Sequence, residues 1–223
     1  MITLVLAEAE VEPIPPELRA HPKLLARAKK RGRAVQHLVL DQAVDHEAME
    51  QLTDGDRRGR PDILHMWMLL ALDGLLSKRQ RVRLFAHTRN DELIRIEPKT
   101  RIMRSQPKFY RLLEDLFRQG VVPLRSPLLR LETGRSLESV LKEEARGTKV
   151  LMDVGGELWR APEFAAAARE ASDVTLVTGG FPRGSFRQAK PEWFDRVVRV
   201  ADEELTVWSA MVPALAGLED GAT

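Results

Sequence analysis

Two loops in the second half of the chain carry residues suited to holding a small ligand. Residues 179–184 (GGFPRG) directly follow an apolar run, where glycines let backbone amides approach a bound molecule closely. Residues 201–206 (ADEELT) also follow an apolar run and precede a helical pattern. Neither loop has the GxGxxG spacing of a dinucleotide site, and the chain lacks a GxxxxGK(S/T) phosphate loop. An isolated Gly-Gly pair is also typical of a tight turn with no ligand. The second loop favours a small-molecule site, because two such loops could enclose one ligand.

Basic residues gather in three segments, and most of them are arginines. The segments are 23–33, 57–60 and 99–111. Guanidinium groups bind phosphate bidentately and stack on bases, which favours a nucleic-acid partner. The same composition, with 30% charged residues and no cysteine, is also typical of a heat-adapted protein whose surface carries ion-pair networks. Charge alone leaves both interpretations open.

Two of these segments have a more specific pattern. In residues 57–62 (RRGRPD), Asp62 stands in the first turn of a predicted helix, where a carboxylate complements the helix dipole. It could instead hold the Arg60 guanidinium in one rotamer for RNA. In residues 100–109 (TRIMRSQPKF), cations recur at intervals that can present several of them to one phosphate backbone. The alternative is a solvated loop beside a buried Phe109.

The composition disfavours several other classes of site. With 35 basic and 33 acidic residues, the net charge is only +2. The chain has no cysteine, and its five histidines lack HxxxH or HxH spacing, which disfavours thiolate chemistry and a metal site. No apolar run reaches the roughly 18 to 20 residues that span a bilayer, and the apolar start is too short for a signal peptide. We therefore expect a soluble cytoplasmic protein without metal or membrane contact.

The apolar pattern predicts the elements that position these loops. Short apolar runs bounded by turn residues predict strands, and longer runs with helical spacing predict helices. Strands and helices alternate in the second half, which favours an α/β fold with parallel strands and ligands at their carboxyl ends. The expected strands cover 2–7, 35–41, 81–88, 92–97, 150–154, 174–178 and 197–201, and the expected helices cover 61–72, 108–119, 136–146, 161–171 and 205–218.

Taken together, these segments resemble the ribosome-biogenesis pseudouridine N1-methyltransferase family, a branch of the knotted SPOUT methyltransferases. The RGRPDI block at 58–63 and the GGFPRG block at 179–184 are the most specific motifs. The matching stretches occur in family order and cover nearly the whole chain. The others are 38–42 (LVLDQ), His65, 86–88 (AHT), 100–104 (TRIMR), and 205–206 (LT) with Trp208.

The resemblance implies a SPOUT-type α/β knot with a parallel sheet, a deep carboxy-terminal trefoil knot and an inserted β-hairpin or extension. Knots are rare, so periodicity alone would never suggest one. Residues 1–223 would form a single methyltransferase domain, with a family-specific insertion around residues 57–105. A homodimer is implied as well.

The implied activity is transfer of a methyl group from S-adenosyl-L-methionine to N1 of a pseudouridine in a small-subunit rRNA hairpin loop during ribosome biogenesis. Ribosomal proteins or assembly factors are further candidate partners. The alternative is a non-catalytic rRNA-binding assembly factor that retains a cofactor pocket for stability. The intact glycines of residues 179–184 favour the enzyme, because a non-enzyme could lose them.

The resemblance also assigns two sets of site residues. The RNA-contacting set is Arg60, Arg101, Arg104 and Lys108, with Asp62 steadying Arg60. Lys108 stands where the family can have an arginine, and lysine keeps the charge but loses the bidentate geometry; Met103 likewise stands where a proline is usual. The cofactor-binding set is Val154, Gly179, Gly180, Gly184, Ala201, Asp202, Glu203, Glu204, Leu205 and Thr206.

Asp41 is the candidate catalytic residue. N1 of pseudouridine is an imide-like nitrogen that attacks well only after losing its proton. Asp41 ends a predicted strand on the side where ligands gather, so its carboxylate could act as the base or orient the ring. The alternative is that Asp41 caps the following helix. Positioning of the two reactants would supply most of the rate, because the methyl donor is already activated.

Overall fold

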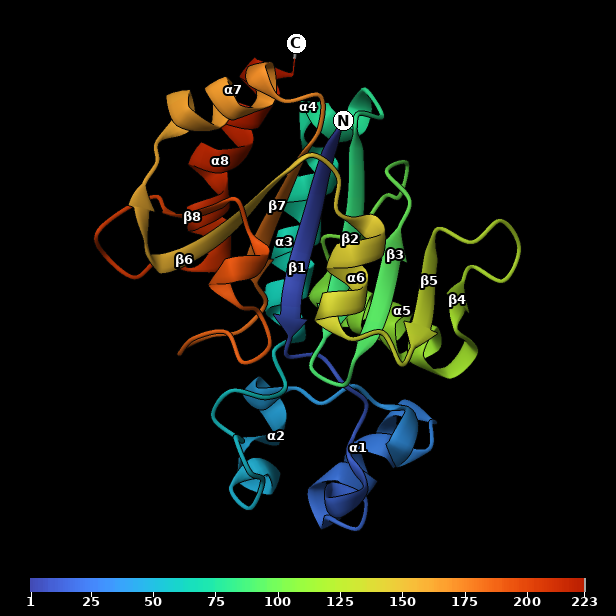
Figure 1. Ribbon diagram of the computed structural model, residues 1–223. Helices are drawn as coiled ribbons and strands as arrows, with labels where there is room; N and C mark the ends of the chain where they lie inside the picture. Colours follow the sequence, from blue (N-terminus) through green and yellow to red (C-terminus); the bar gives the residue numbers. More distant parts are fainter. Residues whose placement is uncertain (223) are drawn as a thin grey trace.

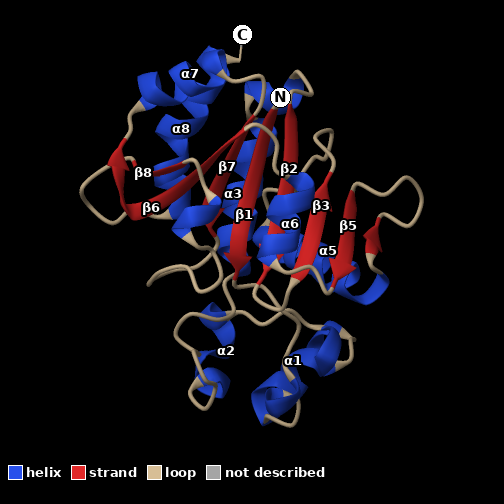
Figure 2. Ribbon diagram, viewed as in Figure 1, coloured by secondary structure: helices blue, strands red, loops and turns tan. Residues whose placement is uncertain are grey.

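An eight-stranded sheet with the order β4-β5-β3-β2-β1-β7-β6-β8 runs through the computed structural model, which describes residues 1–222 (Figure 1). Strands β2, β1, β7, β6 and β8 are parallel, and β3, β5 and β4 extend the sheet with antiparallel pairs. Figure 2 shows helices on both faces. The strands are β1 (Ile2–Ala9), β2 (Val82–Thr88), β3 (Glu92–Ile96), β4 (Val121–Val122), β5 (Leu129–Thr133), β6 (Thr148–Leu158), β7 (Val174–Gly179) and β8 (Arg196–Arg199).

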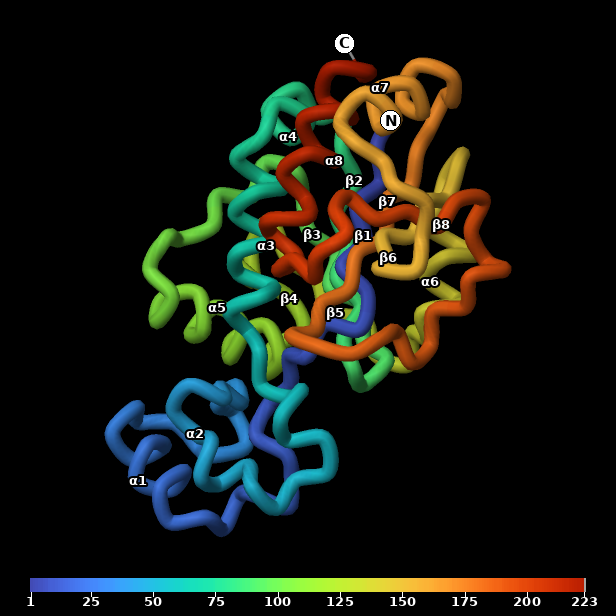
Figure 3. Tube along the Cα trace, turned by 90° about the vertical axis from the view of Figure 1, so that its left-hand side faces the viewer, coloured from blue at the N-terminus to red at the C-terminus, as the bar shows by residue number. Residues whose placement is uncertain are grey.

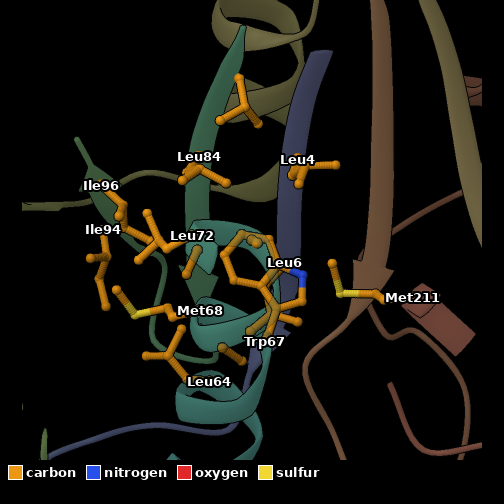
Figure 4. Packing of buried hydrophobic residues seen from close by; sticks show 14 of the residues in the cluster. Leu4, Leu6, Leu64, Trp67, Met68, Leu72, Leu84, Ile94, Ile96 and Met211 are labelled. Atoms are coloured by element: carbon orange, nitrogen blue, oxygen red, sulfur yellow. The ribbon is translucent and has the colours of Figure 1, made fainter. Parts of the chain in front are cut away.

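Burial on both faces explains why the first strand is apolar nearly throughout. Leu4 and Leu6 of β1 pack on one side of the sheet, and Val5 and Ala7 pack on the other. Helices α3, α5, α7 and α8 cover the first side, where Figure 4 shows Trp67 packed against the strands, and α6 covers the second. These helices are α3 (Pro61–Asp73), α5 (Gln106–Gln119), α6 (Leu137–Glu144), α7 (Ala161–Glu170) and α8 (Val207–Gly221), and the short α4 (Leu75–Lys78) follows α3.

Residues 10–60 leave the sheet after β1 and form a small helical lobe before the chain enters α3. Figure 3 shows this lobe, drawn in blue, beyond the carboxyl end of β1. It has its own apolar core, which includes Leu24, Leu38 and Leu40. Arg33 pairs with Asp115 of α5 at 3.0 Å and so fastens the lobe to the main body. Its elements are η1 (Pro16–Leu18), α1 (Pro22–Arg31), η2 (Val35–His37) and α2 (Gln42–Met49).

The α/β class, the parallel sheet and the hairpin of β2 and β3 are confirmed, but the strand predicted at 35–41 is wrong. That segment forms the 3-10 turn η2 and a single bridge from Val39 to Pro13. Leu38 and Leu40 are fully buried as predicted, but they pack among the helices of the lobe rather than in the sheet. Residues 57–105 run from the end of the lobe through α3, β2 and β3, so the domain assignment with an insertion there stays a prediction.

Candidate functional site

A cavity of about 160 Å³ lies at the carboxyl ends of β7 and β8 and beside the middle of β6, between the two loops that stand out in the sequence. One wall is the end of β7 with residues 179–184, and another is the middle of β6 at residues 152–154, because β6 continues to Leu158 and does not end at Val154 as predicted. Residues 198–205 and the first turn of α8 close the cavity. Ligands of α/β sheets bind at this edge. Within residues 1–222, no helix is long and apolar enough to cross a membrane, and no group of three or more His, Asp or Glu side chains is arranged to hold a metal ion.

The lining fits a ligand that has both polar and apolar parts. Thr178 lines the cavity, and its buried hydroxyl has no hydrogen-bond partner. A buried polar group without a partner costs about 1–3 kcal/mol, so a ligand that bonds to this hydroxyl would recover that energy. Phe181 and Leu205 supply apolar wall, and the carboxylate of Glu203 adds negative charge. S-adenosylmethionine combines an aromatic base with cationic groups, so these residues fit it.

Glycines shape the loop after β7. A Cβ on Gly179 would lie 2.7 Å from ring carbons of Phe181, so only glycine allows this ring to fold back against the loop. Gly184 has a φ of +81°, a left-handed conformation that glycine adopts without strain. A Cβ on Gly180 would lie 2.5 Å from the Cα of Ala9, so this glycine permits close packing against β1. Packing and backbone conformation therefore require the glycines of the GGFPRG motif.

Arg60 and Asp62 form a bidentate ion pair at the start of α3. The Nε and Nη2 atoms of Arg60 donate to the two carboxylate oxygens of Asp62 at 2.8 and 2.7 Å. Both side chains are partly exposed. Asp62 occupies the first turn of α3 and also fixes the Arg60 guanidinium, so the two interpretations of this residue are compatible.

The other predicted RNA-binding cations lie between β3 and the first turn of α5, beside α3. Arg101, Arg104 and Lys108 are exposed, and Arg104 makes only a long contact of 3.6 Å with an exposed carboxylate. His65 of α3 forms a hydrogen bond with the Met103 carbonyl at 2.7 Å, and its ring stacks on Phe109 at 4.3 Å. This contact fastens the cationic segment to the helix that begins at the Arg60–Asp62 pair.

Residues 4–219 match the family described as EMG1/NEP1 methyltransferase. The chain belongs to this family. It is 34% identical over 220 residues to the ribosomal RNA small subunit methyltransferase Nep1 of Methanothrix thermoacetophila, covering 99% of this chain and 96% of the relative. It is 40% identical over 186 residues to the Nep1 of Thermococcus kodakarensis, covering 83% of this chain and 84% of the relative.

A solved EMG1/NEP1 structure has the same fold. The crystal structure of Archaeoglobus fulgidus Nep1 bound to S-adenosylhomocysteine superposes with a TM-score of 0.85, at 27% identity, and covers 98% of this chain and 97% of that chain. The SPOUT-type fold class expected from the resemblance is confirmed. Since the aligned region spans almost all of both chains, it includes both the lobe and the cavity.

Most of the residues predicted to bind the cofactor in this EMG1/NEP1 protein lie on the cavity wall. Three lie in the same loops but are not among the residues that line the cavity. Gly180 packs on β1, Asp202 pairs with Arg199 at 2.9 Å, and the Thr206 hydroxyl caps α8. Their contact with a cofactor stays a prediction, as do the roles of the wall residues. The predicted residues on the wall are Val154, Gly179, Gly184, Ala201, Glu203, Glu204 and Leu205.

Sequence reasoning missed three cavity residues that belong to strands. Thr178 and Val198 line the cavity near the ends of β7 and β8, and Met152 lines it from the middle of β6. Glycine motifs identify loops, but they give no sign of which strand residue faces into a cavity. The end of the predicted strand 174–178 would have identified Thr178, because ligands gather at strand ends.

Asp41 lies in the lobe and caps α2. Its Oδ1 accepts a hydrogen bond from the N–H of Ala43 at 3.1 Å. Burial raises the pKa of the Asp41 carboxyl. The residue follows an irregular segment rather than the predicted strand end, and it is not among the residues that line the cavity. The capping role is therefore observed, and the catalytic role stays a prediction.

Two substitutions of Asp41 separate these roles. Asp41→Ala should lower the free energy of unfolding by about 0.5–2 kcal/mol, whereas Asp41→Asn should leave it nearly unchanged because asparagine also caps helices. Urea unfolding measures both. The asparagine variant cannot accept a proton, so methyl transfer at the wild-type rate by this folded variant would exclude Asp41 as the base.

Proposed function

We propose that this EMG1/NEP1 family member transfers the methyl group of S-adenosylmethionine to N1 of a pseudouridine in small-subunit ribosomal RNA. The observation that carries the proposal is the cavity at the strand ends, with its unpartnered Thr178 hydroxyl and glycine-shaped wall. Relatives of similar length are named ribosomal RNA small subunit methyltransferases, and the structural neighbour binds S-adenosylhomocysteine. These names support the cofactor and the rRNA substrate; the choice of pseudouridine N1 comes from the resemblance of the motifs.

The residues of the chain act mainly by positioning. When bound, S-adenosylmethionine supplies a methyl group on a positively charged sulfur. Thr178 and the loop of residues 179–184 hold and orient the ligand, and the apolar walls exclude water. Holding two reactants in the correct geometry provides a large part of the rate in such a displacement. The N1 proton passes to water or to a carboxylate, for which Asp41 is the candidate.

Arg60, Arg101, Arg104 and Lys108 are proposed to bind the RNA backbone. Arg60 is partly exposed and the other three are exposed, and all lie at or beside α3. This arrangement supports phosphate contacts, which would fix the register of a hairpin. A base in a hairpin loop can be turned out of its stack and directed to the cavity. Asp62 supports this contact indirectly, because it restrains the guanidinium of Arg60.

We also propose that the protein works as a homodimer in the cytoplasm, with ribosomal proteins or assembly factors as further partners. Val154, Leu158 and Leu205 are exposed apolar residues on or near the cavity rim, and their burial against a second copy would complete the wall.

The proposed function is tested by transfer of labelled methyl from S-adenosylmethionine to two matched small-subunit rRNA hairpins. One carries uridine and the other carries pseudouridine at the same loop position. Label on the pseudouridine hairpin alone is the expected result. Label on neither hairpin, although both RNA and cofactor bind, would favour the non-catalytic assembly factor.

A further inference from the structure

The carboxylate of Glu8 binds a segment that is distant in sequence. Glu8 lies near the end of β1, is only 3% exposed, and has a left-handed φ of 53°. Its carboxylate accepts hydrogen bonds from the backbone N–H groups of Arg187 at 2.9 Å, Gln188 at 2.8 Å and Ala189 at 3.3 Å. A non-glycine residue with positive φ is strained, so the surrounding contacts must hold it in place. Glu8 thus fixes the segment that follows the glycine loop.

Arg57 connects this carboxylate to the wall of the cavity. Its Nη2 donates to Glu8 at 3.1 Å, its Nε donates to Glu10 at 2.6 Å, and its Nη1 donates to the Ser185 carbonyl at 2.8 Å. The guanidinium also lies 3.9 Å from the centre of the Phe181 ring, which lines the cavity. Because Arg57 is buried, the loss of one partner would leave an uncompensated charge in the interior.

The same contacts reach Arg60, which belongs to the proposed RNA-binding set and lies in the loop of residues 57–60 just before α3, the RNA-binding loop. The backbone N–H of Arg60 donates to the carbonyl of Glu10 at 2.7 Å, so Glu10 holds both the Arg57 side chain and the Arg60 backbone. These contacts form a continuous path from the Phe181 wall through Arg57 and Glu10 to the backbone of Arg60. Neither Glu8 nor Glu10 lines the cavity, and the proposed methyl transfer leaves their burial unexplained.

From this geometry we propose that Glu8 and Arg57 are positioning residues that couple the cofactor cavity to the RNA-binding loop, so that each ligand strengthens binding of the other. The proposal rests on the proposed function, because it requires both ligands. A cofactor that packs on Phe181 restrains residues 181–189. The contacts of Glu8, Arg57 and Glu10 then keep Arg60 in the position that binds RNA. RNA meets a loop that is already ordered, so it binds with a smaller loss of entropy. Coupling is reciprocal, so RNA must raise the affinity for cofactor by the same factor.

The test measures the affinity of the full chain for the pseudouridine hairpin with and without saturating S-adenosylhomocysteine. The wild-type protein should bind RNA about tenfold more tightly when S-adenosylhomocysteine is present, a typical size for coupling between two sites. Arg57→Lys keeps the positive charge but loses the planar fork that contacts Glu8, Glu10 and Ser185 together. For this variant, we expect the ratio of RNA affinity with S-adenosylhomocysteine to RNA affinity without it to fall close to one. Glu8→Gln, which removes the charge and one acceptor oxygen, should have the same effect and serves if Arg57→Lys does not fold.

Arg58→Lys is the matched control. Arg58 is also buried and donates to both oxygens of Glu12 at 2.7 Å, but its bonds do not reach residues 181–189. This variant should keep the wild-type ratio, and an equal loss in both lysine variants would indicate general loosening and overturn the proposal. If the wild-type protein binds both ligands but binds RNA equally well with and without S-adenosylhomocysteine, only the coupling is contradicted, not the proposed function. Failure of the wild-type protein to bind either ligand would contradict the proposed function itself.

Discussion

Gly156→Ala should lower the affinity for S-adenosylhomocysteine at least tenfold. A Cβ at this position of β6 would lie 2.3 Å from the backbone nitrogen of Val198 and 2.5 Å from the carbonyl carbon of Val197. Both atoms belong to the backbone of β8, so they cannot rotate away and the strand must move. Val198 lines the cavity, and the loop that follows β8 forms another wall. Overpacking of this kind typically costs about 1–3 kcal/mol, and we expect at least a tenfold loss of cofactor affinity because the strain falls on the cavity wall.

The neighbouring glycine provides the matched control for this prediction. A Cβ on Gly155 would meet only the side-chain oxygen of Asp153, at 3.4 Å, which is an ordinary contact. Gly155→Ala should therefore keep the wild-type affinity in calorimetric titration and the wild-type midpoint of thermal unfolding. If both alanine variants lost affinity equally, the contact with β8 would not be the cause.

Local patterns predicted the main body of the fold well. The apolar stretch at 61–72 and the amphipathic stretch at 108–119 form α3 and α5, and Gly120 ends α5 in a left-handed conformation. These predictions succeed because each helix presents its apolar face to the one large core. The lobe was not predicted, since its core is small and its buried Leu38 and Leu40 alternate like strand residues although no sheet is there.

In the site, too, local sequence patterns predicted only the features that depend on neighbouring residues. The glycine loop predicted the position of the cavity, because glycine permits tight turns and close backbone approach and these local needs are visible in the sequence. Glu8, Glu10 and Glu12 alternate along the chain, a pattern typical of the exposed face of a strand, yet each is at most 3% exposed. Their burial depends on arginines from distant segments, such as Arg57, and no local pattern predicts such pairs.

The Arg60–Asp62 pair was one of two interpretations of Asp62 from the sequence and was implied by the family resemblance. It gives a second large effect. Asp62→Ala removes a negative charge near the proposed RNA surface, so charge alone predicts tighter binding of RNA. The geometry predicts the opposite. Without Asp62, the Arg60 guanidinium loses its bidentate partner and its fixed rotamer. We therefore expect affinity for the hairpin to fall about tenfold or more, close to the loss in Arg60→Ala, as for other charge-assisted contacts worth about 1–3 kcal/mol.

A double-mutant cycle decides between these two arguments. If Asp62 acts through Arg60, then Asp62→Ala should have little effect on RNA affinity in an Arg60→Ala background, and the two losses will not add. Arg101→Ala is the matched comparison. Arg101 is exposed and is not part of the Arg60–Asp62 ion pair, so the loss of RNA affinity in Arg101→Ala should add to the loss in Asp62→Ala. Affinity for S-adenosylhomocysteine should be unchanged in all of these variants, because none of the three residues lines the cavity. Tighter RNA binding by Asp62→Ala would show that the carboxylate acts only as a charge and that the orientation of Arg60 does not limit recognition.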